Sequence, residues 1–94
     1  KGLRSVLREA IDRLRPEGER NMTAPAWVLF NILDLKFLQG QKVREVAQRL
    51  AMSESNLYRK QRVAIKAAAE MLAEMEREEL KDRKNGERKE QAIG

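Results

Sequence analysis

The sequence of 94 residues contains neither cysteine nor histidine, and these two absences remove most catalytic chemistry. Without cysteine, the chain has no disulfide, no zinc-thiolate site and no thiol nucleophile. Without histidine, it has no Ser-His pair, no imidazole base and no imidazole metal ligand. We therefore expect a protein that is not an enzyme and that uses no metal or other cofactor.

Long hydrophobic runs are also missing, because no apolar stretch approaches the ~18 residues of a membrane span. No signal peptide opens the chain, so we expect a soluble, cytoplasmic protein. The length fits one domain with a single small core. The chain begins with Lys1-Gly2 rather than with Met, so we expect a piece of a longer protein whose effector domain lies outside these 94 residues.

Positive charge is concentrated in one stretch of this chain, whose formal net charge is +5. Residues 41–66 hold seven basic and two acidic side chains, whereas residues 76–90 hold six of each. Lysine and arginine gain free energy when they displace counterions from phosphates. The charge distribution therefore favours a polyanionic partner at residues 41–66, although a solvated helix face is also compatible with it.

Hydrophobic spacing predicts an all-α fold of four helices over residues 1–84, followed by a polar, disordered tail at residues 85–94. The first amphipathic helix ends at Pro16. The second begins at Pro25, where Thr23 can supply a capping hydroxyl, and runs to Gly40. Its apolar side chains, with Trp27 and Phe30 among them, are expected in the core. Asn31 and Asp34 are expected to mark the exposed edge of this second helix.

The third helix, residues 42–50, is about two turns long, and Ser53 can cap a long fourth helix. The fourth helix has apolar residues close to a three-four repeat, namely Leu57, Ile65, Ala68, Leu72 and Met75. The earlier members of this stripe are expected to complete the bundle core. The later part, with Ala68, Leu72 and Met75 as candidates, is expected to contact a second copy in a homodimer.

A short helix, a turn and a second helix over residues 43–66 form the informative unit. Two helices that cross closely need a small residue at the crossing, and Ala47 provides it. The apolar residues expected inside the angle are Val46, Leu50, Met52 and Leu57. The polar residues expected on the opposite side are Ser55, Asn56, Arg59 and Lys60. One helix is thus left with a polar, basic face of a width that a major groove accepts.

Residues 43–50, Val-Arg-Glu-Val-Ala-Gln-Arg-Leu, and residues 52–59, Met-Ser-Glu-Ser-Asn-Leu-Tyr-Arg, carry a family resemblance. The stretch 41–66 resembles the helix-turn-helix of the promoter-binding C-terminal region of bacterial sigma factors and of LuxR-type regulators. The resemblance implies sequence-specific binding of double-stranded DNA by a bacterial transcription regulator module. Carried over by position, the base-contact candidates are Ser55, Asn56, Arg59 and Lys60, and the phosphate-contact candidates are Lys42, Arg44, Ser53, Arg62 and Lys66.

Two positions depart from the family pattern. The family usually has glycine in the turn, where this chain has Ala51, and a left-handed alanine costs on the order of 1 kcal/mol. Either the turn differs slightly in shape or packing compensates for this cost. An apolar residue is common at the position of Lys60, so either the helix is rotated or Gln61 takes the inward place. Tyr58 can pack on the neighbouring helix or reach a phosphate, and we favour packing.

Two other functions fit the same sequence. A protein-interaction or oligomerisation adaptor of a larger signalling protein would use the apolar stripe of the fourth helix and the charged tail. RNA binding would use the same basic face as DNA binding.

Overall fold

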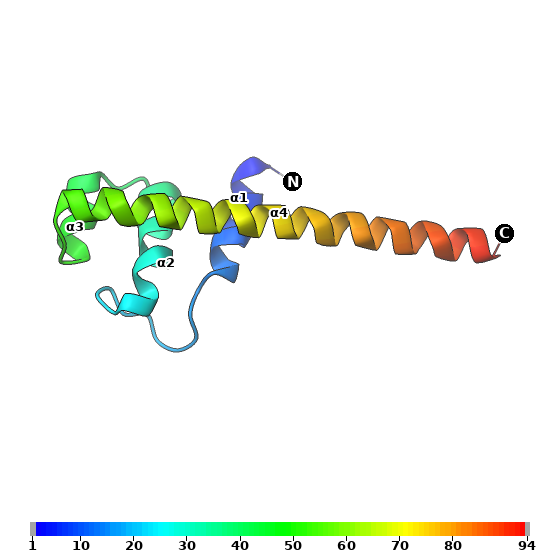
Figure 1. Cartoon of the computed structure of the whole chain (residues 1–94), viewed down its shortest axis with the longest axis horizontal. Coiled ribbons are helices and arrows are strands. Elements are labelled where there is room, and N and C mark those ends of the chain that lie inside the picture. The colour runs from blue at the N-terminus through cyan, green and yellow to red at the C-terminus, as the bar shows by residue number, and fades with distance from the viewer. Residues whose placement is uncertain (1, 94) are drawn as a thin grey trace.

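A computed structural model describes the backbone of residues 2–93 and the side chains of residues 2–84 (Figure 1). Over these residues the chain is all-α, as predicted, and contains no strand. Its four α-helices are α1 (Leu3–Arg13), α2 (Val28–Ile32), α3 (Val43–Arg49) and the long α4 (Glu54–Ile93). A 3₁₀ turn, η1 (Pro25–Trp27), precedes α2, and a π-helical segment, η2 (Leu33–Leu38), follows it.

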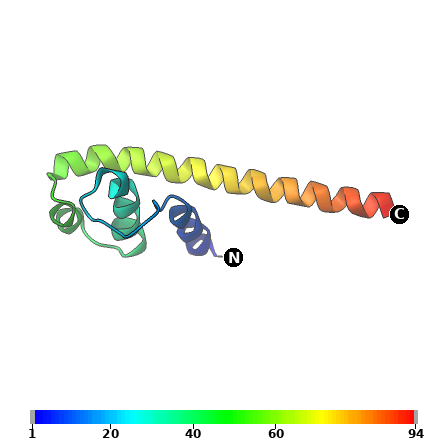
Figure 2. The same ribbon diagram turned by 90° about the horizontal axis from the view of Figure 1, so that it is seen from below.

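The long helix α4 forms one side of the molecule, and the other three helices pack against its N-terminal part (Figure 2). α1 crosses α4, and α4 then continues beyond α1 toward the C-terminus (Figures 1 and 2). The structure describes no side chain beyond residue 84. The domain boundary predicted after that residue and the disordered tail predicted at residues 85–94 therefore stay predictions.

The core lies between α4 and the shorter helices. Trp27 and Phe30 are buried there with their rings edge to face, 5.7 Å apart, so their prediction as core residues is confirmed. The side chains that are fully enclosed come from α1, α2, η2, α3 and α4, and include Ile11, Ile32, Leu35, Val46 and Leu57. A single core shared by all the helices holds the basic stretch in place.

The predicted second helix is helical over its whole length but is not one regular α-helix. The wider π turns of η2 are closed by the amide of Gln39, which donates to the carbonyl of Asp34 at 2.9 Å. Gly40 follows with a φ of +71°, a conformation that favours glycine. The capping hydroxyl predicted at Thr23 is wrong, because the side-chain oxygen of Asn21 accepts the amides of Thr23 and Ala24 instead.

Asn31 and Asp34 do not mark an exposed edge, so that prediction is wrong. Asn31 is completely buried, and its amide nitrogen donates to the carbonyls of Asn21 and Met22. Its oxygen accepts a hydrogen bond from Nε of Arg20 at 2.9 Å, and the same guanidinium pairs with Asp34 at 2.9 Å. The loop before η1 folds back over α2 and supplies the polar partners that a buried amide requires.

The buried face of α4 also differs from the predicted stripe. Leu57, Ala64 and Ala68 are buried, whereas Ile65 is 44% exposed. Gln61 is half-buried and Lys60 is exposed, so Gln61 takes the inward place between Leu57 and Ala64. The buried line therefore runs through residues 57, 61, 64 and 68, which is the three-four spacing of one helix face.

No helix among the described residues is long and apolar enough to cross a membrane.

Candidate nucleic-acid interface

The unit at residues 43–66 consists of α3, a turn and the first three turns of α4. Ala47 is 3% exposed and lies in the core with Val46, Leu50 and Leu57, as predicted for the residues inside the angle of the two helices. Because α3 has only seven residues, its position depends on this packing rather than on its own helical stability. The packing of α3 against α4 leaves the opposite side of α4 available to a partner.

The turn between the two helices depends on Ala51. Its φ of +55° lies in the left-handed region, so alanine adopts here a conformation that favours glycine. The turn is closed by the amide of Met52, which donates to the carbonyl of Ala47 at 3.0 Å. The strain of about 1 kcal/mol expected for a left-handed alanine is thus present, and the packing of Leu50 and Leu57 offsets it.

Ser53 caps the start of α4, as predicted. Its hydroxyl oxygen accepts the amide of Asn56 at 3.1 Å, and its carbonyl accepts the amide of Leu57 at 2.9 Å. The side chain of Ser53 is exposed, so its hydroxyl can still donate to a phosphate. The cap determines the direction in which the following side chains leave the helix.

The predicted contact residues gather on the side of α4 that faces away from the core. The positions 55, 59, 62 and 66 have the same spacing as the buried positions 57, 61, 64 and 68, but are displaced by two residues. Two residues correspond to about 200° around an α-helix, so these two lines lie on opposite faces. Ser55, Arg59, Arg62 and Lys66 are exposed, and Lys60 is exposed beside them. Asn56 is half-buried.

The remaining phosphate candidates come from α3. Lys42 occupies the N-cap position of α3, Arg44 lies in its first turn, and both side chains are exposed. Within the described part of the chain, none of the seven cations of residues 41–66 takes part in an ion pair. Their charge is therefore uncompensated by the protein, which is the state that favours a polyanion.

Two residues of this surface were missed among the predicted contacts. Tyr58 is 51% exposed, so the packing that we favoured covers only half of its side chain, and it lies one turn before Arg62. Arg49, at the end of α3, is also exposed. The signal for Tyr58 was its spacing, because it lies between Ser55 and Arg62 on the same helix.

The three residues predicted for a homodimer lie mainly against their own chain. Ala68 is only 6% exposed and belongs to the core. Leu72 and Met75 are half-buried and, with Val6 of α1, line a groove. These residues complete the packing of α4 on α1, and the two-fold contact through them stays a prediction.

No group of three or more acidic side chains within the described residues is arranged to hold a metal ion. Comparison of the chain with known protein families, with characterised proteins and with solved structures finds no match. The function must therefore be argued from the geometry and charge of the molecule itself.

Proposed function

We propose that this chain is a sequence-specific DNA-binding module that places the first turns of α4 in the major groove of double-stranded DNA. The observation that carries the proposal is the exposed face of α4, where Arg59, Arg62 and Lys66 have no ion pair among the described residues. The major groove of B-DNA, about 12 Å wide, admits a helix of this kind. The proposed activity is binding without catalysis, as part of a bacterial transcription regulator in the cytoplasm.

Base recognition is assigned to the polar side chains of the first two turns of α4. Arginine and lysine recognise the O6 and N7 acceptors of guanine, and asparagine recognises the N6 and N7 atoms of adenine. The side chains that supply these groups are Arg59, Lys60 and Asn56, with the hydroxyl of Ser55 as a fourth contact. The cap at Ser53 supports this role because it keeps the first turn of α4 in one conformation.

Phosphate contacts are assigned to cations at the two ends of the unit. Lys42 and Arg44 lie at the start of α3, whereas Arg62 and Lys66 lie on the second and third turns beyond the start of α4. Four such contacts would release about four counterions, so the logarithm of the binding constant should fall with the logarithm of salt with a slope of roughly −3 to −4. These contacts supply affinity and orientation, while the base contacts supply selectivity.

A binding titration at several salt concentrations tests the proposal. Sequences selected from a random duplex pool by the 94-residue chain would be measured by fluorescence anisotropy against a scrambled duplex of equal length. The expected result is a steep salt dependence for both duplexes and tighter binding of the selected one. Failure to bind any duplex at low salt would reject the proposal.

Double-stranded DNA is preferred over RNA as the ligand because the deep, narrow major groove of A-form RNA does not admit a helix. An RNA duplex of the selected sequence would serve as competitor in the same assay. Displacement of the DNA by equimolar RNA duplex would favour RNA binding through the same face instead.

A further inference from the structure

An apolar groove of about 220 Å³ lies where α4 packs on α1 and η2. Every side chain that lines it is apolar, and two large ones remain substantially exposed, Phe37 at 38% and Ile65 at 44%. Large apolar side chains that stay exposed around a groove are a feature of protein-binding sites. Other lining residues are Leu7 and Ile11 of α1, Leu33 of η2, and Ala69 and Leu72 of α4.

The size of this apolar groove limits what can fill it. Pockets that enclose a drug-sized ligand usually measure roughly 300–1,000 Å³, which is more than this groove provides. One or two apolar side chains of a partner protein suit it better, because the anchor residues of protein interfaces fill small pockets of this kind. Such a partner would also remove Phe37 and Ile65 from water, which favours binding.

Arginines lie beside the apolar groove on both helices that form it. Arg62 lies three residues before Ile65 on α4, and residues three apart are neighbours on a helix surface. On α1, Nη2 of Arg4 donates to the carbonyl of Leu38 at 2.8 Å. Because Leu38 directly follows Phe37, this bond holds the guanidinium of Arg4 close to a lining residue.

Arg8 completes a cationic rim, which we define as Arg4, Arg8 and Arg62. It lies on α1 three residues before Ile11, which lines the groove. None of these three arginines takes part in an ion pair among the described residues. Positive charge that the protein does not compensate therefore borders an apolar surface.

Two acidic residues have a similar spacing from lining residues, Asp34 three before Phe37 and Glu76 four after Leu72. Neither compensates the cationic rim. Asp34 pairs with Arg20 at 2.9 Å. Glu76 lines a separate, acidic groove of about 510 Å³.

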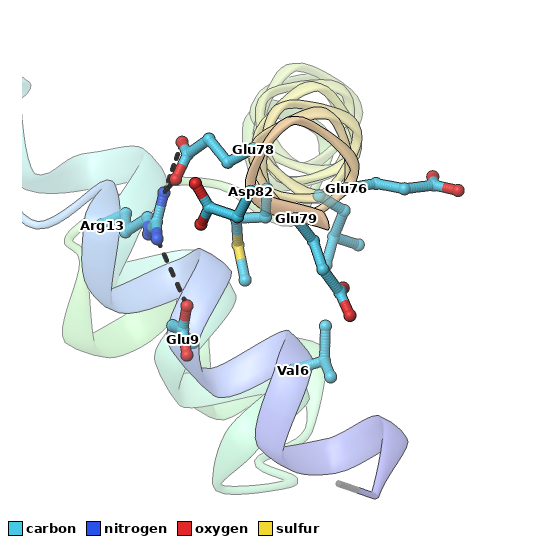
Figure 3. A pocket seen from close by; sticks show the side chains of 9 residues that line it. Val6, Glu9, Arg13, Glu76, Glu78, Glu79 and Asp82 are labelled. Carbon is cyan, nitrogen blue, oxygen red and sulfur yellow. Dashed lines mark hydrogen bonds and ion pairs between the residues drawn. The ribbon is translucent and has the colours of Figure 1, made fainter. Parts of the chain in front are cut away.

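This acidic groove lies on the other side of α1, which crosses α4 between the two grooves (Figures 1 and 2). Within it, Arg13 of α1 donates to both Glu9 and Glu78 (Figure 3). The pKa of Arg13 is raised, mainly by its hydrogen bond to Glu78. The acidic side chains of the second half of α4 are thus separated by α1 from the apolar groove, whose own rim stays positive.

We propose that the apolar groove binds an acidic amphipathic α-helix of a partner protein. One or two apolar side chains of that helix would lie against Phe37 and Ile65, and its aspartates or glutamates would pair with the cationic rim. A helix presents anchors and carboxylates three or four residues apart, which is the spacing between lining residues and rim on this chain. The proposal does not depend on DNA binding, because only Arg62 belongs to both sites.

A second copy of this chain matches the apolar groove less well. Its other exposed apolar side chains include Leu3, Val63 and Leu80. Leu3 and Val63 each adjoin an arginine, which the cationic rim would repel. Leu80 lies within residues 76–84, where four acidic and four basic side chains balance. None of the three brings the excess of negative charge that the rim requires.

A synthetic helical peptide tests the proposal with the whole 94-residue chain. The probe is a labelled peptide of about five helical turns, built from alanine with two leucines one turn apart and glutamates three or four residues from each leucine. One control peptide has serine in place of both leucines, and another has lysine in place of every glutamate. We expect fluorescence anisotropy to show saturable binding of the acidic peptide and at least about tenfold weaker binding of both controls.

Variants of the chain locate the binding site. Ile65→Ser and Arg8→Glu should each weaken binding of the acidic peptide about fivefold to tenfold. Val63→Ser and Arg59→Glu make the same changes at exposed positions of α4 outside the apolar groove. At physiological salt they should leave binding within about twofold. Because Arg59 lies on the face proposed for DNA, this control also measures any attraction of the peptide to that face.

Thermal unfolding followed by circular dichroism identifies any variant that fails to fold, and Phe37→Ser or Arg4→Glu then replaces it. DNA binding is measured on the same variants. Ile65→Ser should keep DNA binding while it loses the peptide. Loss of DNA binding in the parent chain would therefore reject the proposed function without affecting this proposal.

Four results would overturn the proposal. The acidic peptide could fail to bind, or the serine peptide could bind as tightly, which would mean that charge alone attracts it. The control variants could weaken binding as much as the groove variants, which would place the peptide elsewhere. Sedimentation could show a dimer of the chain that Ile65→Ser dissociates, which would make a second copy the occupant.

Discussion

The two halves of α4 carry their charges in opposite ways. At residues 54–66 the cations lie opposite the buried face and have no ion pair among the described residues. At residues 70–84 several charges are paired, Glu78 with Arg13 of α1 and Glu79 with Arg83 of α4. Charges that the protein already compensates offer little to a partner, whereas uncompensated ones retain their field. The comparison therefore supports the proposal that the first half of α4, rather than the second, is the part that meets a polyanion.

The largest expected effect is a difference in stability between substitutions in the two halves of α4. The first half packs in the core, and the second half extends beyond α1. Leu57→Ala removes a completely buried side chain at the junction of α3 and α4 and should lower the free energy of unfolding by about 2–5 kcal/mol. Leu80→Ala removes a side chain that is 50% exposed and should cost under about 1 kcal/mol. Urea unfolding measures both. Equal losses would mean that the two halves of α4 contribute alike to the core.

Removal of equal charge from the two halves should affect DNA binding very differently. Arg59→Ala combined with Lys60→Ala should weaken binding to a selected duplex about a hundredfold and reduce selectivity. The matched control, Arg77→Ala combined with Lys81→Ala, removes two exposed cations from the second half and should change binding less than about threefold. The measurement is a mobility-shift titration at fixed salt. Similar losses for the two pairs would show that net charge alone controls binding.

A glycine substitution in the turn should stabilise the basic end of the molecule. Ala51→Gly relieves the left-handed strain of about 1 kcal/mol and should raise the free energy of unfolding by up to about 0.5 kcal/mol, after the entropy that glycine adds to the unfolded chain is subtracted. Ala73→Gly, at an exposed position within α4, should instead lower it by about 1 kcal/mol. Thermal unfolding measures both variants. A loss of stability on Ala51→Gly would contradict the prediction.

The smallest effect is expected where α1 meets the acidic half of α4. Glu78→Gln breaks the ion pair with Arg13 on the surface, where water already screens both charges. The unfolding temperature should stay within experimental error of the parent chain. A large loss of stability would show that this ion pair anchors α1.

Several features of the basic unit could be predicted because they depend on residues close together in sequence. The cap at Ser53 and the small residue at Ala47 are each determined by a turn of a few residues. For Ala51 two outcomes were open, a turn of different shape or a left-handed alanine, and its φ of +55° shows the second. For Lys60 the sequence left two alternatives, a rotated helix or an inward Gln61. The sequence could not choose between them, because Gln61 is polar and gives no sign that it faces the core.

The errors share a different origin. Asn31 was expected at an exposed edge because it is polar, but Arg20 and the loop carbonyls of Asn21 and Met22 bury it. Ile65 was expected in the core because it is apolar and fits a three-four repeat, yet Ala64 takes that place and leaves Ile65 at a groove. Polarity predicts exposure only when no other segment of the chain covers the residue.

The sequence by itself determined the helical periodicity, the turn chemistry and the position of the basic stretch. These are local properties, because hydrogen bonds and side-chain spacing along a helix involve residues only a few places apart. The folded arrangement decided which surfaces meet. It placed Arg13 against Glu78, 65 residues away, and brought Phe37 beside Ile65 to form the apolar groove. Burial depends on the neighbours that packing supplies, and those neighbours are distant in sequence.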